Sequence, residues 1–137
     1  MSDIVTSPNG AIFYAPARPY PISRTVRAGD FVYTSALGDR VRSKTNDPLG
    51  DGPEAFDEEA RGTFRAIAEA LQLAGASLAD VVDCQVWLRE PENFEPMNRI
   101  FREFFTETQP VRSVFQNVFM FNFRIELKVV AYAPAGR

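Results

Sequence analysis

Residues 56–75 read FDEEARGTFRAIAEALQLAG, and residues 80–90 read DVVDCQVWLRE. In the first stretch, apolar side chains recur at spacings of three and four, which is the period of an amphipathic helix. Gly75 is placed to end that helix, because glycine readily adopts the left-handed conformation that closes many helices. The apolar stripe consists of Phe56, Ala60, Phe64, Ile67, Ala68 and Leu71.

The second stretch alternates, which predicts a strand over Asp80 to Glu90. Its side chains then form two sets that point to opposite sides of a sheet. We expect the first set to face the core, and the second, which is mixed, to face a pocket or a partner. The first set is Val82, Cys84, Val86 and Leu88, and the second is Val81, Asp83, Gln85 and Trp87.

Similar patterns continue on both sides of these stretches. After Pro91 a second apolar stripe predicts a helix that ends at Gln109-Pro110. Runs of apolar and β-branched residues predict two closing strands, about residues 111–119 and 123–132. Other expected elements are an irregular arm over residues 1–20 with a short strand at 11–14, strands over 24–27 and 31–35, and a loop over 39–53. The second stripe consists of Phe94, Met97, Phe101, Phe104 and Phe105.

This order of elements predicts an α+β fold in which a mixed β-sheet carries two helices packed on one face. The chain of 137 residues fits one domain, residues 1–137. The other face of the sheet needs a cover, and a subunit interface is the natural candidate. The twelve phenylalanines suit such a division between core and interface.

The amino-acid composition limits the classes of partner that the protein can bind. The formal net charge is −3, and nucleic-acid binding needs a concentrated basic surface, so we expect no nucleic-acid partner. No apolar run is long enough to span a bilayer, and the N-terminus lacks the pattern of a signal peptide. The single cysteine excludes an intrachain disulfide. A cytoplasmic protein with no membrane partner is the simplest interpretation.

The sequence contains no histidine. The commonest general base is therefore missing, and Ser-His or Cys-His nucleophile pairs cannot form. One cysteine cannot supply a His/Cys zinc site, and we expect neither a metal nor a cofactor. The remaining groups suit a reaction that needs only positioning and polarisation, such as hydrolysis of a reactive imine by a bound water.

Arg112 opens a strand that is otherwise apolar, and an unpaired desolvated charge is very costly. Its guanidinium matches a carboxylate in bidentate geometry, so its partner is either a ligand or a salt bridge within or between subunits. If the last two strands form a hairpin that turns near residues 119–121, Glu126 is a cross-strand neighbour of Arg112. Glu126 then either orients an attacking water or simply pairs with Arg112 or Lys128.

Several stretches, in order, are typical of one known family. They are VRAGDFVYTS (26–35), LAGASLADVV (73–82), NFEPMN (93–98) with Phe104-Phe105, PVRS (110–113) and IEL (125–127). Each is weak alone, but their order and spacing are specific. From about Pro21 to its end, the chain resembles the Rid (YjgF-like) family, also labelled endoribonuclease L-PSP.

The resemblance implies a chorismate-mutase-like fold that assembles into a trimeric barrel, with clefts between the subunits of the homotrimer. It also implies an activity: cofactor-independent hydrolysis of enamine or imine intermediates that carry a carboxylate, giving a 2-keto acid and ammonia. Within such a cleft, Arg112 corresponds to the carboxylate-binding arginine and Glu126 to the water-positioning acid. Asn98 and the pair Ser35-Ala36 correspond to residues that line the cleft.

Two departures from the family pattern concern the cleft. Ile22 stands where the family has a tyrosine, and Tyr20, two residues earlier, is a candidate substitute. Ala36 replaces the usual glycine, which restricts close approach of a ligand to the backbone. These changes favour an alternative, a non-catalytic trimer that binds small carboxylates or regulates. A third interpretation is a holdase-like protein that uses the aromatic segment 119–123. An endoribonuclease is disfavoured because the chain is acidic and lacks histidine.

Overall fold

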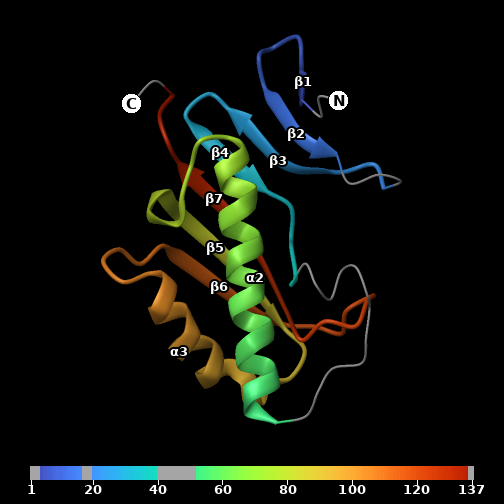
Figure 1. Ribbon diagram of the computed structural model, residues 1–137, viewed down its shortest axis with the longest axis vertical. Helices are drawn as coiled ribbons and strands as arrows, with labels where there is room; N and C mark the ends of the chain where they lie inside the picture. The colour runs from blue at the N-terminus through green and yellow to red at the C-terminus, as the bar shows by residue number, and fades with distance from the viewer. Residues whose placement is uncertain (1–3, 17–19, 40–51, 136–137) are drawn as a thin grey trace.

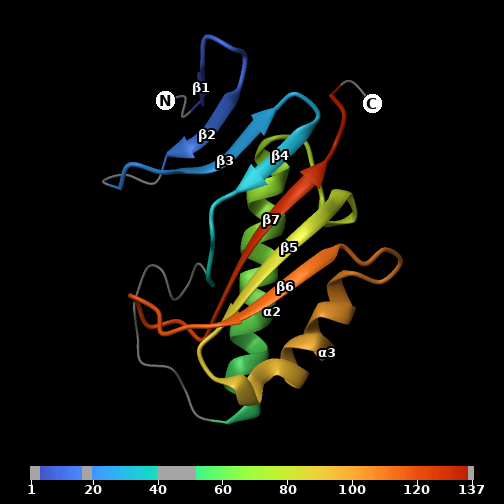
Figure 2. The ribbon, with the colours of Figure 1, turned by 180° about the vertical axis from the view of Figure 1, so that it is seen from behind.

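The computed structural model describes residues 4–16, 20–39 and 52–135. Within these residues, two α-helices cover one face of a seven-stranded sheet (Figure 1). Figure 2 shows the sheet from its other face, which neither helix covers. The strands are β1 (Ile4–Thr6), β2 (Ile12–Pro16), β3 (Ser23–Ala28), β4 (Phe31–Thr34), β5 (Val81–Leu88), β6 (Val111–Gln116) and β7 (Ile125–Tyr132), and the helices are α2 (Pro53–Leu73) and α3 (Phe94–Phe104).

The predicted fold class, a mixed sheet with two helices on one face, is confirmed. The strand order is β1-β2-β3-β4-β7-β5-β6, and β5 pairs with β6 in parallel, while the other pairs are antiparallel. The parallel pair requires a crossover, which α3 supplies. Most of the predicted loop, residues 40–51, lies outside the described residues. In the part of the chain that the structure describes, no helix is both long and apolar enough for a membrane span.

Strand β2 confirms the short strand expected at residues 11–14, whereas β1 lies where only an irregular arm was expected. These strands form an antiparallel hairpin, in which Val5 pairs with Phe13, and β2 extends the sheet beyond β3. The turn between them depends on Gly10, whose φ of 91° is open to glycine at little cost. Its amide donates to the carbonyl of Ser7 at 2.9 Å, which closes the turn.

Helix α2 begins with Pro53, at a position where a missing backbone N–H costs little. Its end confirms the role expected of Gly75, which has a φ of 78°. The amide of Gly75 donates to the carbonyl of Gln72 at 3.1 Å, and that of Ala76 donates to Leu71 at 3.0 Å. These two bonds are a Schellman motif, which turns the chain sharply toward β5.

The predicted inward set of β5 is correct for Cys84, Val86 and Leu88, which are buried, and wrong for Val82, which is 44% exposed. The cause is a β-bulge between Val81 and Asp83. Over this stretch β5 advances by two residues while its partner β7 advances by only one. A bulge reverses the alternation at one residue. Val81 therefore points into the core although it lies in the expected outward set.

At the C-terminal end, the predicted end of the second helix is wrong, and the hairpin that was considered for the last two strands is not formed. Helix α3 ends at Phe104, five residues before Gln109. The strands β6 and β7 do not form a hairpin, because β5 lies between them and pairs with both. A β5 strand with buried valines favours a central position. The connection from Asn117 to Arg124 is long enough to pass the end of β5. There the Asn117 amide donates to the Leu88 carbonyl at 2.9 Å.

The main core lies between the helices and the sheet. Phe64 of α2 is fully buried and stacks on Phe104 of α3 with ring centroids 4.7 Å apart. On the opposite face of the sheet, aromatic side chains remain accessible in the single chain, including Phe31, which lies 5.3 Å from Tyr132 between ring centroids. One face of the sheet is thus filled by the chain itself, and the other is not.

Candidate active site

Arg112 lies on β6, the last strand of the sheet, with its side chain toward α3. Its Cζ atom is 4.9 Å from the ring centroid of Phe101 and 5.9 Å from that of Phe94. One amino group also lies 3.7 Å from the Met97 sulfur, in hydrogen-bond geometry. Aromatic faces attract a guanidinium but leave most of its N–H donors free.

The guanidinium of Arg112 is half-buried and has no carboxylate partner among the described residues. The intrachain salt bridge considered from the sequence is therefore not formed within that part of the chain. Glu126 and Lys128 likewise have no ion pair there. A half-buried arginine without a counterion favours an anionic ligand or partner.

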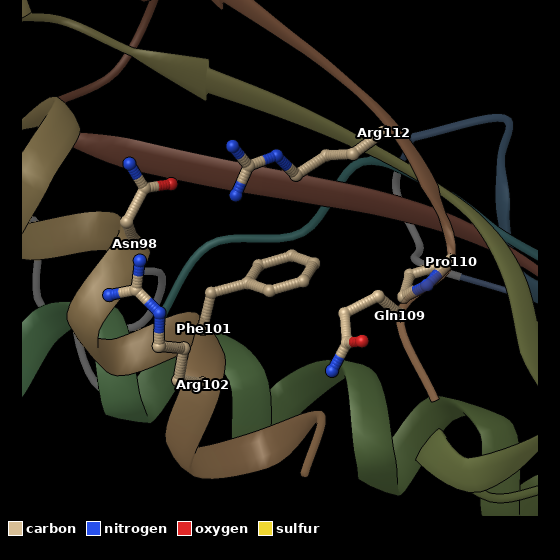
Figure 3. Close-up of a pocket in the computed structure, with 6 residues that line it drawn as sticks. All are labelled: Asn98, Phe101, Arg102, Gln109, Pro110 and Arg112. Carbon is tan, nitrogen blue, oxygen red and sulfur yellow. The ribbon is translucent and has the colours of Figure 1, made fainter. Parts of the chain in front are cut away.

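A cavity of about 310 Å³ opens beside Arg112. Figure 3 shows the Arg112 side chain extending across it toward Asn98, with Phe101 between β6 and the helix. The Oδ1 atom of Asn98 is buried without a hydrogen-bond partner in the described part of the chain, while its Nδ2 donates to Glu95 at 3.4 Å. The structure thus brings two of the predicted site residues, Arg112 and Asn98, to one pocket.

Glu126 lies in a second cavity of about 320 Å³, on the open face of the sheet. It is half-buried, and burial raises the pKa of its carboxyl above the usual value. Trp87, its partner on β5, stacks on Phe115 of β6 with ring centroids 5.8 Å apart. Ala36 and the segment 117–121 complete this pocket, so the structure places Glu126 and Ala36 together.

The cross-strand contact between Arg112 and Glu126, which depended on a hairpin of the last two strands, is not formed. Arg112 is opposite Cys84 in the sheet, and Glu126 is opposite Trp87. Cys84 and Trp87 are three residues apart along β5 and point to opposite faces. The two residues expected to share a site therefore lie on opposite sides of the sheet in one chain.

The remaining predicted residues line neither pocket. The Ser35 hydroxyl donates to the Ser23 carbonyl at 2.6 Å, so it is engaged within the chain. Tyr20 and Ile22 are 59% and 50% exposed, and a hydrogen bond of 2.9 Å joins the Ile22 amide to the Tyr20 carbonyl.

Sequence reasoning missed Arg102 and Gln109, which line the Arg112 pocket, and gave Trp87 no specific role. A signal for Arg102 existed, because residues four apart on a helix share a face and Asn98 was already a candidate. Phe101 was assigned to the apolar stripe of α3, and it also forms the floor beneath Arg112.

The described residues hold no cluster of three or more histidine, cysteine, aspartate or glutamate side chains suited to a metal. Cys84, on the core side of β5, is fully buried, and burial raises the pKa of its thiol to about 12. It therefore packs as a small apolar residue, as the sequence predicted.

The fold and the two pockets define a class: a small α+β protein with two helices on one sheet face, a half-buried arginine on the edge strand and a half-buried acid on the open face. The chain belongs to the family described as Endoribonuclease L-PSP, whose pattern matches residues 13–133.

Named relatives agree with this assignment. A protein of Dermatophagoides farinae named 2-iminobutanoate/2-iminopropanoate deaminase is 33% identical over 106 residues, which cover 74% of this chain and 79% of that protein. The crystal structure of RidA from the Antarctic bacterium Psychrobacter sp. has a TM-score of 0.73 and 27% identity, over 85% of this chain and 92% of that one. A Streptococcus pyogenes protein described as a member of the yjgF family shares the fold with a TM-score of 0.72, at 21% identity, over 98% of this chain and 99% of the other. The resemblance to Rid (YjgF-like) proteins is confirmed.

Proposed function

We propose that the protein is a deaminase that hydrolyses imines or enamines carrying a carboxylate, releasing a 2-keto acid and ammonia. The observation that carries this proposal is the half-buried guanidinium of Arg112, which has no carboxylate partner among the described residues and borders a cavity of about 310 Å³. Such a cavity suits a small acid. The names of the curated relatives support the same reaction class.

In the proposed reaction, Arg112 binds the substrate carboxylate through paired N–H donors and fixes the C=N carbon near a water. Glu126 accepts a proton from that water as its oxygen bonds to the carbon. The nitrogen takes up protons and leaves as ammonia when the C–N bond breaks. The hydroxyl of the intermediate then loses its proton to form the ketone, so the overall change is addition of water and loss of ammonia.

Because Arg112 and Glu126 lie on opposite sides of the sheet, a site that uses both requires two copies of the chain. We therefore propose a homotrimer in which the Arg112 pocket of one protomer meets the Glu126 pocket of its neighbour. The uncovered sheet face, with Phe31, Tyr33 and Tyr132 between 40% and 47% exposed, supports an assembly of this kind. Tyr20, Ile22, Ser35 and Ala36 are proposed to border the same cleft, with residues 1–137 as one domain.

Subunit complementation tests this arrangement. Arg112→Ala and Glu126→Gln chains, each with its own tag, are inactive alone and are purified as mixed oligomers after co-expression. Random mixing restores about a quarter of the wild-type activity, because about a quarter of the interfaces combine an intact Arg112 with an intact neighbouring Glu126. Activity is measured as release of 2-ketobutyrate from 2-iminobutanoate formed in situ.

The matched control mixes Arg112→Ala with a chain that carries both substitutions, which leaves no interface with an intact Arg112. Light scattering verifies that each variant assembles as the wild type does. Mixed oligomers that assemble but gain nothing over the control would show that the two residues do not cooperate across an interface.

One observation favours a second candidate, a non-catalytic carboxylate-binding trimer. The Ser35 hydroxyl and amide are engaged by Ser23 and Arg24 of the same chain, and Ile22 offers no hydroxyl. A protein of this kind binds 2-ketobutyrate through Arg112 and releases no keto acid from any member of an imino-acid panel.

A further inference from the structure

The pocket beside Arg112 contains a second cation, Arg102. It lies one helical turn after Asn98 on α3, so both side chains project from the same face of the helix. Both line the cavity with Arg112. In Figure 3 the Arg102 side chain runs back along the helix, and its guanidinium lies at the end of the pocket that Asn98 occupies.

The other arginine of α3 shows what pairing looks like on this helix. Arg99 donates to both carboxylate oxygens of Asp57 on α2, at 3.0 and 3.1 Å. Arg61 of α2 pairs in the same way with Glu103, at 2.9 and 2.7 Å. The surface between the two helices therefore supplies an acid for each of these arginines.

Arg102 has no such partner in the described part of the chain. An exposed arginine without a partner is common by itself. Here, however, it shares a cavity with Arg112, which is also unpaired, and the residues that line the cavity include no aspartate or glutamate. The pocket thus carries two positive charges that the described residues do not neutralise.

We propose that the substrate carries a second carboxylate, so that it is a dicarboxylic 2-imino acid of four or five carbons. Arg112 binds the carboxylate next to the C=N carbon, and Arg102 binds the distal one, since guanidinium groups match carboxylates in shape and charge. A cavity of about 310 Å³ is at the small end of ligand sites, which suits a compact dianion. This inference rests on the proposed function. The distal carboxylate is unchanged by the reaction, in which oxygen replaces nitrogen at the imine carbon.

A binding experiment tests the second carboxylate without requiring turnover. Calorimetry compares 2-oxoglutarate with 2-ketobutyrate, two product analogues that share the keto-acid end and differ in the distal carboxylate. The wild type binds 2-oxoglutarate about five- to tenfold more tightly, and this preference shrinks as salt is added. Arg102→Gln reduces the ratio to about one.

Arg65→Gln is the matched control, because it removes one positive charge from an exposed arginine on α2 that does not line this pocket. It keeps the wild-type ratio. Equal affinity of the wild type for the two acids overturns the inference, and so does a preference that persists in Arg102→Gln.

Turnover separates this inference from the proposed function. The 2-imino acids derived from glutamate and from 2-aminobutanoate are generated by amino-acid oxidases with catalase, and keto-acid release is followed. Hydrolysis of both acids with no preference for the dicarboxylate contradicts this inference and leaves the proposed function standing. No hydrolysis of either acid, with a binding preference that depends on Arg102, contradicts the proposed function and leaves the dicarboxylate site standing.

Discussion

Two pockets of nearly equal size, about 310 and 320 Å³, lie on opposite faces of the same sheet and differ in chemistry. The pocket on the helix side holds Arg102 and Arg112. The pocket on the open side holds Glu126 among aromatic side chains and the segment 117–121. A single chain therefore separates Arg112 from Glu126, and neither pocket alone has both groups that the proposed imine hydrolysis uses.

Among substitutions in the two pockets, Glu126→Gln has the largest expected effect, which is on kcat/KM. With Glu126 as the base, kcat/KM falls about 10²- to 10⁴-fold on losing its carboxylate. In the wild type, kcat/KM declines as the pH drops through the raised pKa of Glu126, above the ordinary value of about 4.3 for a glutamate. This acidic limb is absent from the residual activity of the variant. Glu58→Gln, at an exposed site on α2, serves as the control, and an unaltered limb in Glu126→Gln would refute the role.

Arg112→Ala affects the other pocket and acts on binding. Loss of one partner of a charge-assisted pair weakens binding of 2-ketobutyrate about 30- to 300-fold by calorimetry. The affinity of Arg112→Lys for 2-ketobutyrate lies between those of the wild type and Arg112→Ala, because lysine retains the charge but not the paired donors. Wild-type affinity in a correctly assembled Arg112→Ala oligomer would show that the carboxylate binds elsewhere.

The smallest expected effect is on thermal stability. Its dependence on pH differs between substitutions in the two pockets. Burial raises the pKa of Glu126, so the folded protein binds this proton more tightly than the unfolded chain does. The stability that this proton contributes is complete below the ordinary glutamate pKa and is lost as the pH rises through the raised value. Glu126→Gln therefore raises Tm by about 1–3 °C near pH 8, and the gain disappears below about pH 4.

Arg112→Met is the counterpart on the other face. This variant keeps the Glu126 carboxyl, so the gain in Tm near pH 8 that is expected for Glu126→Gln is absent from it. Scanning calorimetry of both variants from about pH 4 to about pH 8 makes the comparison. A gain for Glu126→Gln that does not vary with pH would contradict burial of an ionised carboxyl.

Local patterns predicted the elements of this fold well. The period of residues 56–71 gave α2, and Gly75 marked its end because one glycine in the left-handed region closes the helix. The alternation of β7 places Leu127 and Val129 in the core. These features follow from interactions within a few residues of each other, which sequence periodicity records directly.

The errors arose where structure depends on distant pairing. The position of β5 between β6 and β7 is set by which strands are most buried and by what a connection can span, and neither is visible in a run of residues. That order decides that Arg112 and Glu126 are apart. Arg102 was overlooked because an exposed charge on a helix is usually solvated, and its pocket exists only when α3 packs beside β6.

The bulge at Val82 has a consequence for how relatives of this chain vary in length. At the bulge, β5 advances by two residues while β7 advances by one. One residue of β5 can therefore be gained or lost at this point without inverting the side chains that follow. The same insertion beyond Cys84 would turn Trp87 inward and Leu88 outward. Gaps in alignments of homologous β5 strands should therefore gather around residues 81–83.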